Sequence, residues 1–175
     1  MIIRKVEMRD AEEWVRLKNT VWRTAYCHIM PIEVFDEQDH NFPNKVAQFR
    51  ERRLNENGHI GYVVEDEGRI VALADATRVS FYEYYKGLGY ADLGAMYMLP
   101  EYQRQGLGKI LFDRIVDEFK SMGATTMVIG VLKDNTRARQ AYEKWGGVLD
   151  SHEEKFKKLD REYDEVFYIF DLREL

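Results

Sequence analysis

The residues with the clearest chemical potential are Tyr102-Gln-Arg-Gln-Gly-Leu-Gly108, which lie between an apolar run and an amphipathic run. The apolar run, 93–99, ends at Pro100, and the amphipathic run extends from Lys109 to about Ser121. A strand, a glycine-bearing turn and a helix in this order form a receptor for phosphate. The N–H groups of the turn and the unpaired N–H groups of the helix start point at one anion. The stretch therefore predicts binding of a pyrophosphate-bearing cofactor.

Two other phosphate motifs do not fit these residues. A P-loop requires a glycine where Gln103 stands, and it requires Ser or Thr directly after Gly108-Lys109, where the chain has isoleucine. A dinucleotide fingerprint would need a third glycine at Leu111. A kinase or a nucleotide-dependent dehydrogenase is therefore disfavoured. The pattern that fits is Gln-x-x-Gly-x-Gly, with Gly106 as its first glycine.

A second motif lies downstream, after the strand-like run 125–132. Residues 135–146 follow the pattern Asn-x-x-Ala-x-x-x-Tyr-x-x-x-Gly, with Asn135 as a favourable N-cap and Gly146-Gly147 as the helix end. Taken together, the two motifs resemble those of the GCN5-related N-acetyltransferase (GNAT) family. The resemblance extends over roughly 1–172 and is sharpest over 92–147.

This resemblance implies a mixed α/β fold. The expected sheet is central, mostly antiparallel and of six to seven strands, splayed at the cofactor site and flanked by helices. The length of 175 residues predicts one domain over 1–175. It also implies that acetyl-CoA is the acetyl donor and that the acceptor is the primary amine of a small molecule, protein or peptide. The amine is expected to attack the acetyl group directly, in a ternary complex. A homodimer is compatible with it. The alternative function is a regulator that binds acetyl-CoA without catalysis.

The resemblance also assigns the cofactor contacts. The backbone of 96–98 is expected to pair with the pantetheine arm as an added strand would. The amides of 104–109 are expected to meet the pyrophosphate, with Arg104 and Lys109 adding charge. The complete set of expected cofactor-binding residues is Met96, Tyr97, Met98, Arg104, Gln105, Gly106, Leu107, Gly108, Lys109 and Asn135.

Two residues are expected to move protons. The resemblance places Tyr142 beside the cofactor sulfur as general acid, and a phenol of pKa about 10 is protonated at neutral pH; its alternative role is a helix-face aromatic packed on the sheet. Asp92 stands near the start of the strand that leads into the turn, at what looks like the offset of the glutamate base of histone-acetylating members. Asp is shorter than Glu, so a water relay is expected. The alternative for Asp92 is an exposed carboxylate at a strand end.

Other candidates are weaker. Glu101, Glu83 and His28 are further possible bases, and Cys27 beside His28 gives the only hint of a thiol enzyme. The resemblance implies that the acceptor lies near 21–38 and near the aromatic run 81–89. In that run four aromatic residues with Glu83 could form a wall for a cation, a dimer contact or a lid.

Composition narrows the function classes further. The 175 residues carry a formal net charge of −5, which argues against nucleic-acid binding through a broad basic face. One cysteine leaves no internal disulfide and no cysteine-rich zinc site, and no metal site is expected. No apolar run approaches membrane-spanning length, and the start lacks a signal-peptide pattern. We therefore expect a cytoplasmic protein without a membrane partner.

The elements that position these residues can be read from periodicity. Strands are predicted over 1–8, 60–65, 69–76, 93–99, 125–132, 152–159 and 163–172, the second and third as a hairpin around Asp66-Glu67-Gly68. Helices are predicted over 10–26, with an Asp10/Glu13 capping box, over pieces that begin at Pro31 and Pro43, over 109–121 and over 135–146.

Overall fold

The computed structural model describes residues 1–55 and 58–175, and this part of the chain forms one seven-stranded sheet with helices in its connections. The strands are β1 (Ile2–Lys5), β2 (His59–Asp66), β3 (Arg69–Thr77), β4 (Ala91–Met98), β5 (Thr126–Leu132), β6 (Val148–Lys158) and β7 (Arg161–Asp171). The helices are η1 (Met8–Asp10), α1 (Ala11–Tyr26), α2 (Ile32–His40), α3 (Phe42–Asn55), α4 (Glu83–Gly87), η2 (Pro100–Tyr102), α5 (Leu107–Ser121) and α6 (Thr136–Lys144).

The sheet has the order β1-β2-β3-β4-β5-β7-β6. The described pairings β1–β2, β5–β7 and β6–β7 are antiparallel, and β4–β5 is parallel. The register of β4 with β5 covers Ala91 and Asp92, the first two residues of an eight-residue strand. The predicted mixed α/β fold with a mostly antiparallel, seven-stranded sheet is confirmed.

The chain divides into two compact units. The first consists of Met1–Asp75 with Ala95–Phe112, and the second of Ala76–Gly94 with Asp113–Leu175. Strands β3 and β4 and helix α5 contribute residues to both. The single domain expected from the sequence stays a prediction.

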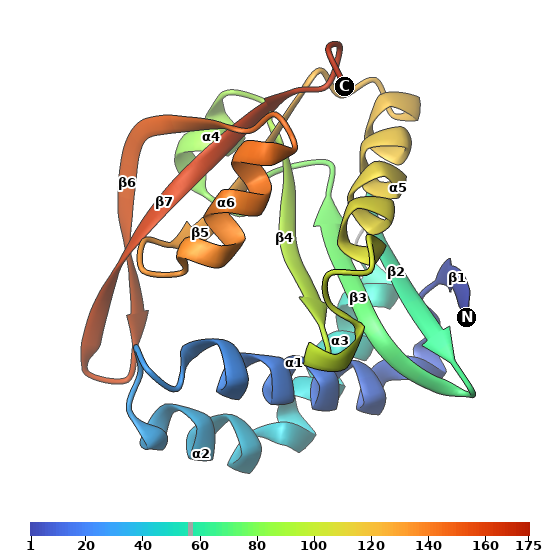
Figure 1. Ribbon diagram of the computed structural model, residues 1–175, viewed down its shortest axis with the longest axis vertical. Coiled ribbons are helices and arrows are strands. Elements are labelled where there is room, and N and C mark those ends of the chain that lie inside the picture. The colour runs from blue at the N-terminus through green and yellow to red at the C-terminus, as the bar shows by residue number, and fades with distance from the viewer. Residues whose placement is uncertain (56–57) are drawn as a thin grey trace. The chain divides into compact units, whose positions relative to one another are not determined.

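In the first unit, α1 packs its apolar face inward. Trp14, Leu17 and Val21 recur at helical spacing and are buried. The ring of Trp14 lies 5.3 Å from that of Phe49 in α3, and α2 runs alongside α1 (Figure 1). The hairpin β2–β3 turns at Glu67 and Gly68, which have φ of 49° and 78°. Two left-handed residues suit the twist of a tight hairpin.

The start of α1 differs from the predicted capping box. Asp10 does not cap α1 with its side chain; its carboxylate instead accepts hydrogen bonds from Arg4 at 2.7 and 2.9 Å and from the backbone N of Glu7 at 2.7 Å. Glu13 accepts from the backbone N of Ile70 in β3. The predicted Asp10/Glu13 pair is therefore wrong, because both carboxylates find partners outside the helix.

In the second unit, β6 and β7 form a long hairpin (Figure 1). Their register shifts between Leu149 and Glu153. Strand β6 begins at Val148, four residues earlier than predicted. The core includes Tyr85, Val128 and Phe167, which are fully buried.

The short helices η1, η2 and α4 were not predicted. Helix α4 lies in the aromatic run 81–89. Tyr85 on this helix is fully buried, and its hydroxyl donates to Asp150 Oδ2 at 2.8 Å. Contacts with β6 therefore hold this turn in place, and no local pattern could have indicated them.

Candidate functional site

The glycine-bearing turn leads into a helix start that can bind an anion. Helix α5 begins at Leu107, two residues earlier than predicted, and its first bond runs from Ile110 N to Gly106 O at 3.1 Å. The N–H groups of 107–109 lie in the first turn, where they have no intrahelical acceptor. The helix is 15 residues long, so its dipole adds a partial positive charge at this end.

The backbone of the turn is held in an unusual conformation. Arg104 and Gly106 have φ of 62° and 83°, in the left-handed region. Glycine adopts this region readily, and no atom lies within 4 Å of the position that a Cβ on Gly106 would take. Arginine adopts it at a cost of roughly 1–2 kcal/mol. Open space above a left-handed turn is what an approaching diphosphate needs.

Two glutamine side chains fix this turn to the preceding segment. Gln103 Nε2 donates to Met98 O at 2.9 Å, which ties the turn to the end of β4. Gln105 Nε2 donates to Glu101 O at the same distance. The glutamine of the Gln-x-x-Gly-x-Gly pattern, Gln103, therefore has a structural role, because it binds the carbonyl of Met98 at the end of the strand.

The charged side chains of the turn suit a diphosphate as well. Arg104 and Lys109 are exposed, and Lys109 Nζ lies 5.6 Å from the ring centre of Phe112. Leu107 is buried and anchors the helix start. Backbone amides, a helix start and two cations together fit a pyrophosphate group.

The predicted cofactor-binding strand residues lie at the end of β4, in the same unit as the turn. The hydroxyl of Tyr97 accepts a hydrogen bond from Trp22 Nε1 at 2.7 Å, and Lys18 Nζ lies 5.9 Å from its ring centre. The side chain of Tyr97 is thus bound by α1. The role predicted for 96–98 concerns the backbone and is independent of this contact.

The second motif forms α6 as predicted. Asn135 caps the helix through its Oδ1, which accepts from Ala138 N at 3.2 Å. Tyr142 is half-buried on this helix, with its ring edge-on to Tyr168 at 5.9 Å and 6.0 Å from Trp145. Tyr142 therefore packs on β7 as a helix-face aromatic would, and this contact also fixes the direction of its ring.

Asp92 is not the exposed strand-end carboxylate of the alternative interpretation. It is 0% exposed, and its Oδ2 accepts from Ser80 Oγ at 2.7 Å and from Phe81 N at 3.3 Å. Burial raises the pKa of Asp92 from 3.8 to about 6, and the two hydrogen bonds oppose this rise. A carboxyl group of this pKa can accept a proton near neutral pH.

A second buried carboxylate lies in the same unit. Glu165 in β7 is 9% exposed, and its Oε1 accepts from the Tyr82 hydroxyl at 2.8 Å. Burial and the charges of Glu154 and Asp92 raise the pKa of Glu165. Gly130 in β5 leaves room for this pair, because a Cβ there would lie 2.3 Å from the Tyr82 hydroxyl.

No sequence pattern indicated Ser80 as a partner of Asp92 or Glu165 as a partner of Tyr82. For the Tyr82–Glu165 pair one signal was available in Gly130, which interrupts an apolar strand and so indicates a close approach by another group. Nothing in the sequence indicated which group approaches.

The aromatic run 81–89 is divided between the interior and the surface. Tyr85 is fully buried, so the structure removes it from the predicted four-residue cation wall. Phe81 and Tyr84 are each 50% exposed, and Tyr84 stacks on His152 with ring centres 4.1 Å apart. The exposed Glu83 pairs with Lys86 at 3.3 Å.

The weaker candidates are not assembled into a site. Glu101, His28 and Cys27 are exposed. Across 1–55 and 58–175 no group of three or more His, Cys, Asp or Glu side chains is placed to hold a metal ion. Among the same residues, no helix combines the length and the apolar character that crossing a membrane requires.

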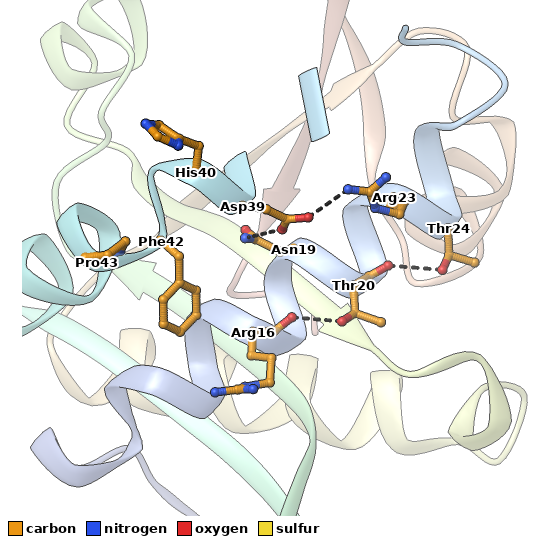
Figure 2. Close-up of a pocket in the computed structure, with 9 residues that line it drawn as sticks. All are labelled: Arg16, Asn19, Thr20, Arg23, Thr24, Asp39, His40, Phe42 and Pro43. Carbon is orange, nitrogen blue, oxygen red and sulfur yellow. Dashed lines mark hydrogen bonds and ion pairs between the residues drawn. The ribbon is translucent and has the colours of Figure 1, made fainter. Parts of the chain in front are cut away.

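An open pocket of about 770 Å³ lies in the first unit, between α1, α2 and the start of α3 (Figure 2). Its polar wall is largely occupied by internal contacts. Arg23 pairs with Asp39 at 2.7 Å, and the hydroxyls of Thr20 and Thr24 donate to carbonyls of their own helix. Arg16 lies 5.6 Å from the ring centre of Phe42. The pocket overlaps the predicted acceptor segment 21–38 only in part.

Comparison with known sequences gives a consistent result. A sequence model described as the acetyltransferase (GNAT) family matches residues 14–147, or 134 of the 175. The uncharacterized N-acetyltransferase YuaI of Bacillus subtilis is 25% identical over 135 residues, which cover 76% of this chain and 72% of that protein. The L-amino acid N-acyltransferase MnaT of Escherichia coli is 26% identical over 118 residues, or 66% of this chain and 64% of that protein.

A shorter match is higher in identity. The ribosomal protein bS18-alanine N-acetyltransferase of Escherichia coli is 40% identical over 47 residues, which cover 27% of this chain and 32% of that enzyme.

Solved structures share the fold. PaiA N-acetyltransferase of Thermoplasma acidophilum, solved with coenzyme A, matches with a TM-score of 0.74 at 16% identity and covers 94% of this chain and 96% of its own. YncA of Salmonella typhimurium, solved with acetyl-CoA, matches with a TM-score of 0.69 at 21% identity, over 98% of this chain and 94% of its own.

Proposed function

Because this chain belongs to the acetyltransferase (GNAT) family and is an acetyl-CoA-dependent acyltransferase, we propose that it acetylates a primary amine by direct attack in a ternary complex. The observation that carries the proposal is the turn at 103–109. Its left-handed backbone and the start of α5 present amides and two cations to a diphosphate. Acetyl-CoA supplies the activated acetyl group and a thiol leaving group.

The cofactor-binding role is proposed for the residues that the sequence indicated. The N–H groups of 104–109 would bind the pyrophosphate, and the backbone of 96–98 would pair with the pantetheine arm. Asn135 is proposed as a cofactor-binding residue as well, and its side chain also caps α6, the helix that carries Tyr142.

Two proton transfers are required of the chain. An amine of lysine-like pKa is neutral at pH 7 only at a cost of about 5 kcal/mol, so a base is useful. Asp92 would accept that proton, directly or through a water molecule, and its raised pKa suits the task. Tyr142 would give its hydroxyl proton to the departing sulfur. Both protons are then exchanged with solvent.

The acceptor is proposed to be the amine of a small molecule or of a protein N-terminus. The relatives named above include an L-amino acid N-acyltransferase and an enzyme named for alanine of a ribosomal protein, so both acceptor classes are represented among similar proteins. The homodimer and the cytoplasmic location stay predictions.

The proposal is tested in two steps. The melting temperature is measured with acetyl-CoA, CoA, NAD and ATP at about 100 times a typical Kd, where binding gives about 2.7 kcal/mol, or roughly 5 to 10 °C for a chain of this size. Thiol release is then followed with free amino acids, polyamines and a peptide with N-terminal alanine. A shift with acetyl-CoA and CoA alone, followed by amine-dependent thiol release, supports the proposal. Binding without thiol release for any amine would indicate the non-catalytic regulator instead.

The acid role has its own test. Tyr142→Phe removes the proton donor and should lower kcat about 100-fold or more, with little change in the Kd of CoA. Tyr163→Phe, which removes a hydroxyl from β7, is the matched control. Wild-type turnover in Tyr142→Phe would remove Tyr142 from the mechanism.

A further inference from the structure

Ser80 lies at the centre of the contacts around Asp92. Its side chain is 3% exposed, and its backbone N donates to Tyr90 O at 3.0 Å. Its Oγ donates to Asp92 Oδ2 at 2.7 Å and accepts from Tyr82 N at 3.2 Å. The hydroxyl is thus held from two sides, and its proton is directed at one carboxylate oxygen.

The two oxygens of Asp92 have different surroundings. Oδ2 takes two donors, Ser80 Oγ and Phe81 N. Oδ1 is buried and has no hydrogen-bond partner among the described residues. A buried acceptor left unpaired is costly and requires an explanation. Since Oδ2 is occupied, Oδ1 is the atom that remains for an incoming donor.

The charged neighbours of Asp92 make a donor at Oδ1 more favourable. Glu165 on β7 lies in the same unit and accepts a hydrogen bond from the Tyr82 hydroxyl. Glu154 on β6 is half-buried and pairs with His152 at 3.0 Å. The charges of Glu154 and Asp92 raise the pKa of Glu165, so the negative charge of this group favours an added proton.

We propose that Ser80 is a positioning residue, which holds Asp92 by Oδ2 so that Oδ1 takes the proton from the acceptor amine. Because Asp92 is 0% exposed, the proton passes through a water molecule. An N–H bond of the ammonium group breaks as its proton moves to the water, a proton of that water forms the O–H bond at Oδ1, and the amine keeps the electron pair for attack on the acetyl carbon. The inference rests on the proposed function, because it assumes that Asp92 is the base.

The experiment compares pH profiles of kcat/KM for the wild type, Ser80→Ala, Ser80→Thr and Asp92→Asn. Loss of the Ser80 hydrogen bond removes a contact that favours the carboxylate, so Ser80→Ala should move the acid limb up by about 1 pH unit. It should also lower kcat about tenfold while KM changes little, because the base is less well oriented. Ser80→Thr keeps the hydroxyl and should restore both. A merely structural role would lower activity equally at every pH.

A second measurement does not depend on turnover. The Asp92 carboxyl is titrated by carbon NMR in protein with labelled aspartate, with Asp92→Asn used to assign its signal. The pKa should rise in Ser80→Ala, which loses a hydrogen bond to the carboxylate, and return toward the wild-type value in Ser80→Thr, which keeps the hydroxyl. Recovery in Ser80→Thr separates this effect from general loss of structure, and the melting temperature of each variant is measured alongside.

The outcomes separate the two hypotheses. If Asp92→Asn keeps the wild-type acid limb, Asp92 is not the base, and the role proposed for it falls together with this inference. If Asp92→Asn abolishes the limb but Ser80→Ala leaves it in place, Asp92 remains the base and only the role of Ser80 is overturned. An unchanged pKa of the Asp92 carboxyl in Ser80→Ala would also overturn the role proposed for Ser80.

Discussion

The turn at 103–109 draws its chemistry from backbone N–H groups of consecutive residues, whereas the carboxylate cluster draws its chemistry from side chains of separate segments. The two cations of the turn, Arg104 and Lys109, are exposed. The cluster joins Ser80 and Tyr82 to Asp92 on β4 and Glu165 on β7, all of them withdrawn from solvent to a large extent.

This difference has an energetic consequence. An exposed charge interacts weakly with its surroundings, because water and salt screen it. A buried carboxylate interacts strongly and is costly to keep ionised. Single substitutions in the turn should therefore produce graded losses of binding. Single substitutions in the cluster should change both activity and stability, often in opposite directions.

The largest expected effect is on activity in the cluster. Asp92→Asn should lower kcat/KM about 100-fold or more at pH 7, because a general base typically contributes that much. Glu101→Gln is the matched control, since it also removes one carboxylate charge, from an exposed site beside the turn. Steady-state kinetics with the best amine substrate measure both. Equal losses in the two variants would break the contrast between buried and exposed carboxylates.

The same substitution should stabilise the fold. The pKa of Asp92 is raised from 3.8 to about 6, so the native state binds this proton more tightly than the unfolded chain. Proton binding by Asp92 therefore stabilises the native state, fully below pH 3.8, and this stabilisation is lost as the pH rises through about 6. The stabilisation lost amounts to about 3 kcal/mol. Asp92→Asn removes this loss and should raise stability by up to about 3 kcal/mol at pH 8.

Denaturant unfolding at pH 4 and pH 8 checks this expectation. The gain should be present at pH 8 and largely absent at pH 4. A destabilised variant at pH 8 would show that the charge of Asp92 is compensated by a contact beyond those described.

Two glycines offer a matched comparison of stability. Gly130→Ala forces the Tyr82 hydroxyl away from Glu165 and should destabilise the fold by about 1–3 kcal/mol. Gly106→Ala meets no atom but strains a left-handed residue, so about 1 kcal/mol is expected, together with weaker binding of CoA. Thermal unfolding and CoA titration of both variants separate the effects. A loss of CoA affinity in Gly130→Ala as large as that in Gly106→Ala would contradict the comparison.

The smallest effect is expected for a charge in the turn. Arg104→Ala should weaken CoA binding about two- to fivefold at 0.15 M salt, because the exposed guanidinium is screened. Arg104→Lys keeps the charge and should bind nearly as well. Titrations at low and high salt check the origin of the effect, since a loss that does not shrink with added salt would indicate a role other than charge.

Much of the molecule could be predicted because its signals are local. The hairpin turn at Glu67-Gly68, the cap at Asn135 and the turn before α5 each depend on residues a few positions apart, and the structure confirms these elements. The predicted cap of α1 failed for the opposite reason, since Asp10 and Glu13 bind partners on other elements. Local pattern cannot weigh a capping bond against a distant partner.

By itself the sequence determined the order of the elements, the pattern of the phosphate-type turn and the identity of Tyr142 and Asp92 as candidates. Only the tertiary structure decided that Asp92 is buried, that Ser80 occupies one of its oxygens, and that Glu165 lies in the same acidic cluster. The physical reason is the range of the interactions. Backbone geometry is set by neighbours in the chain, whereas desolvation and Coulomb energy depend on which distant segments pack together.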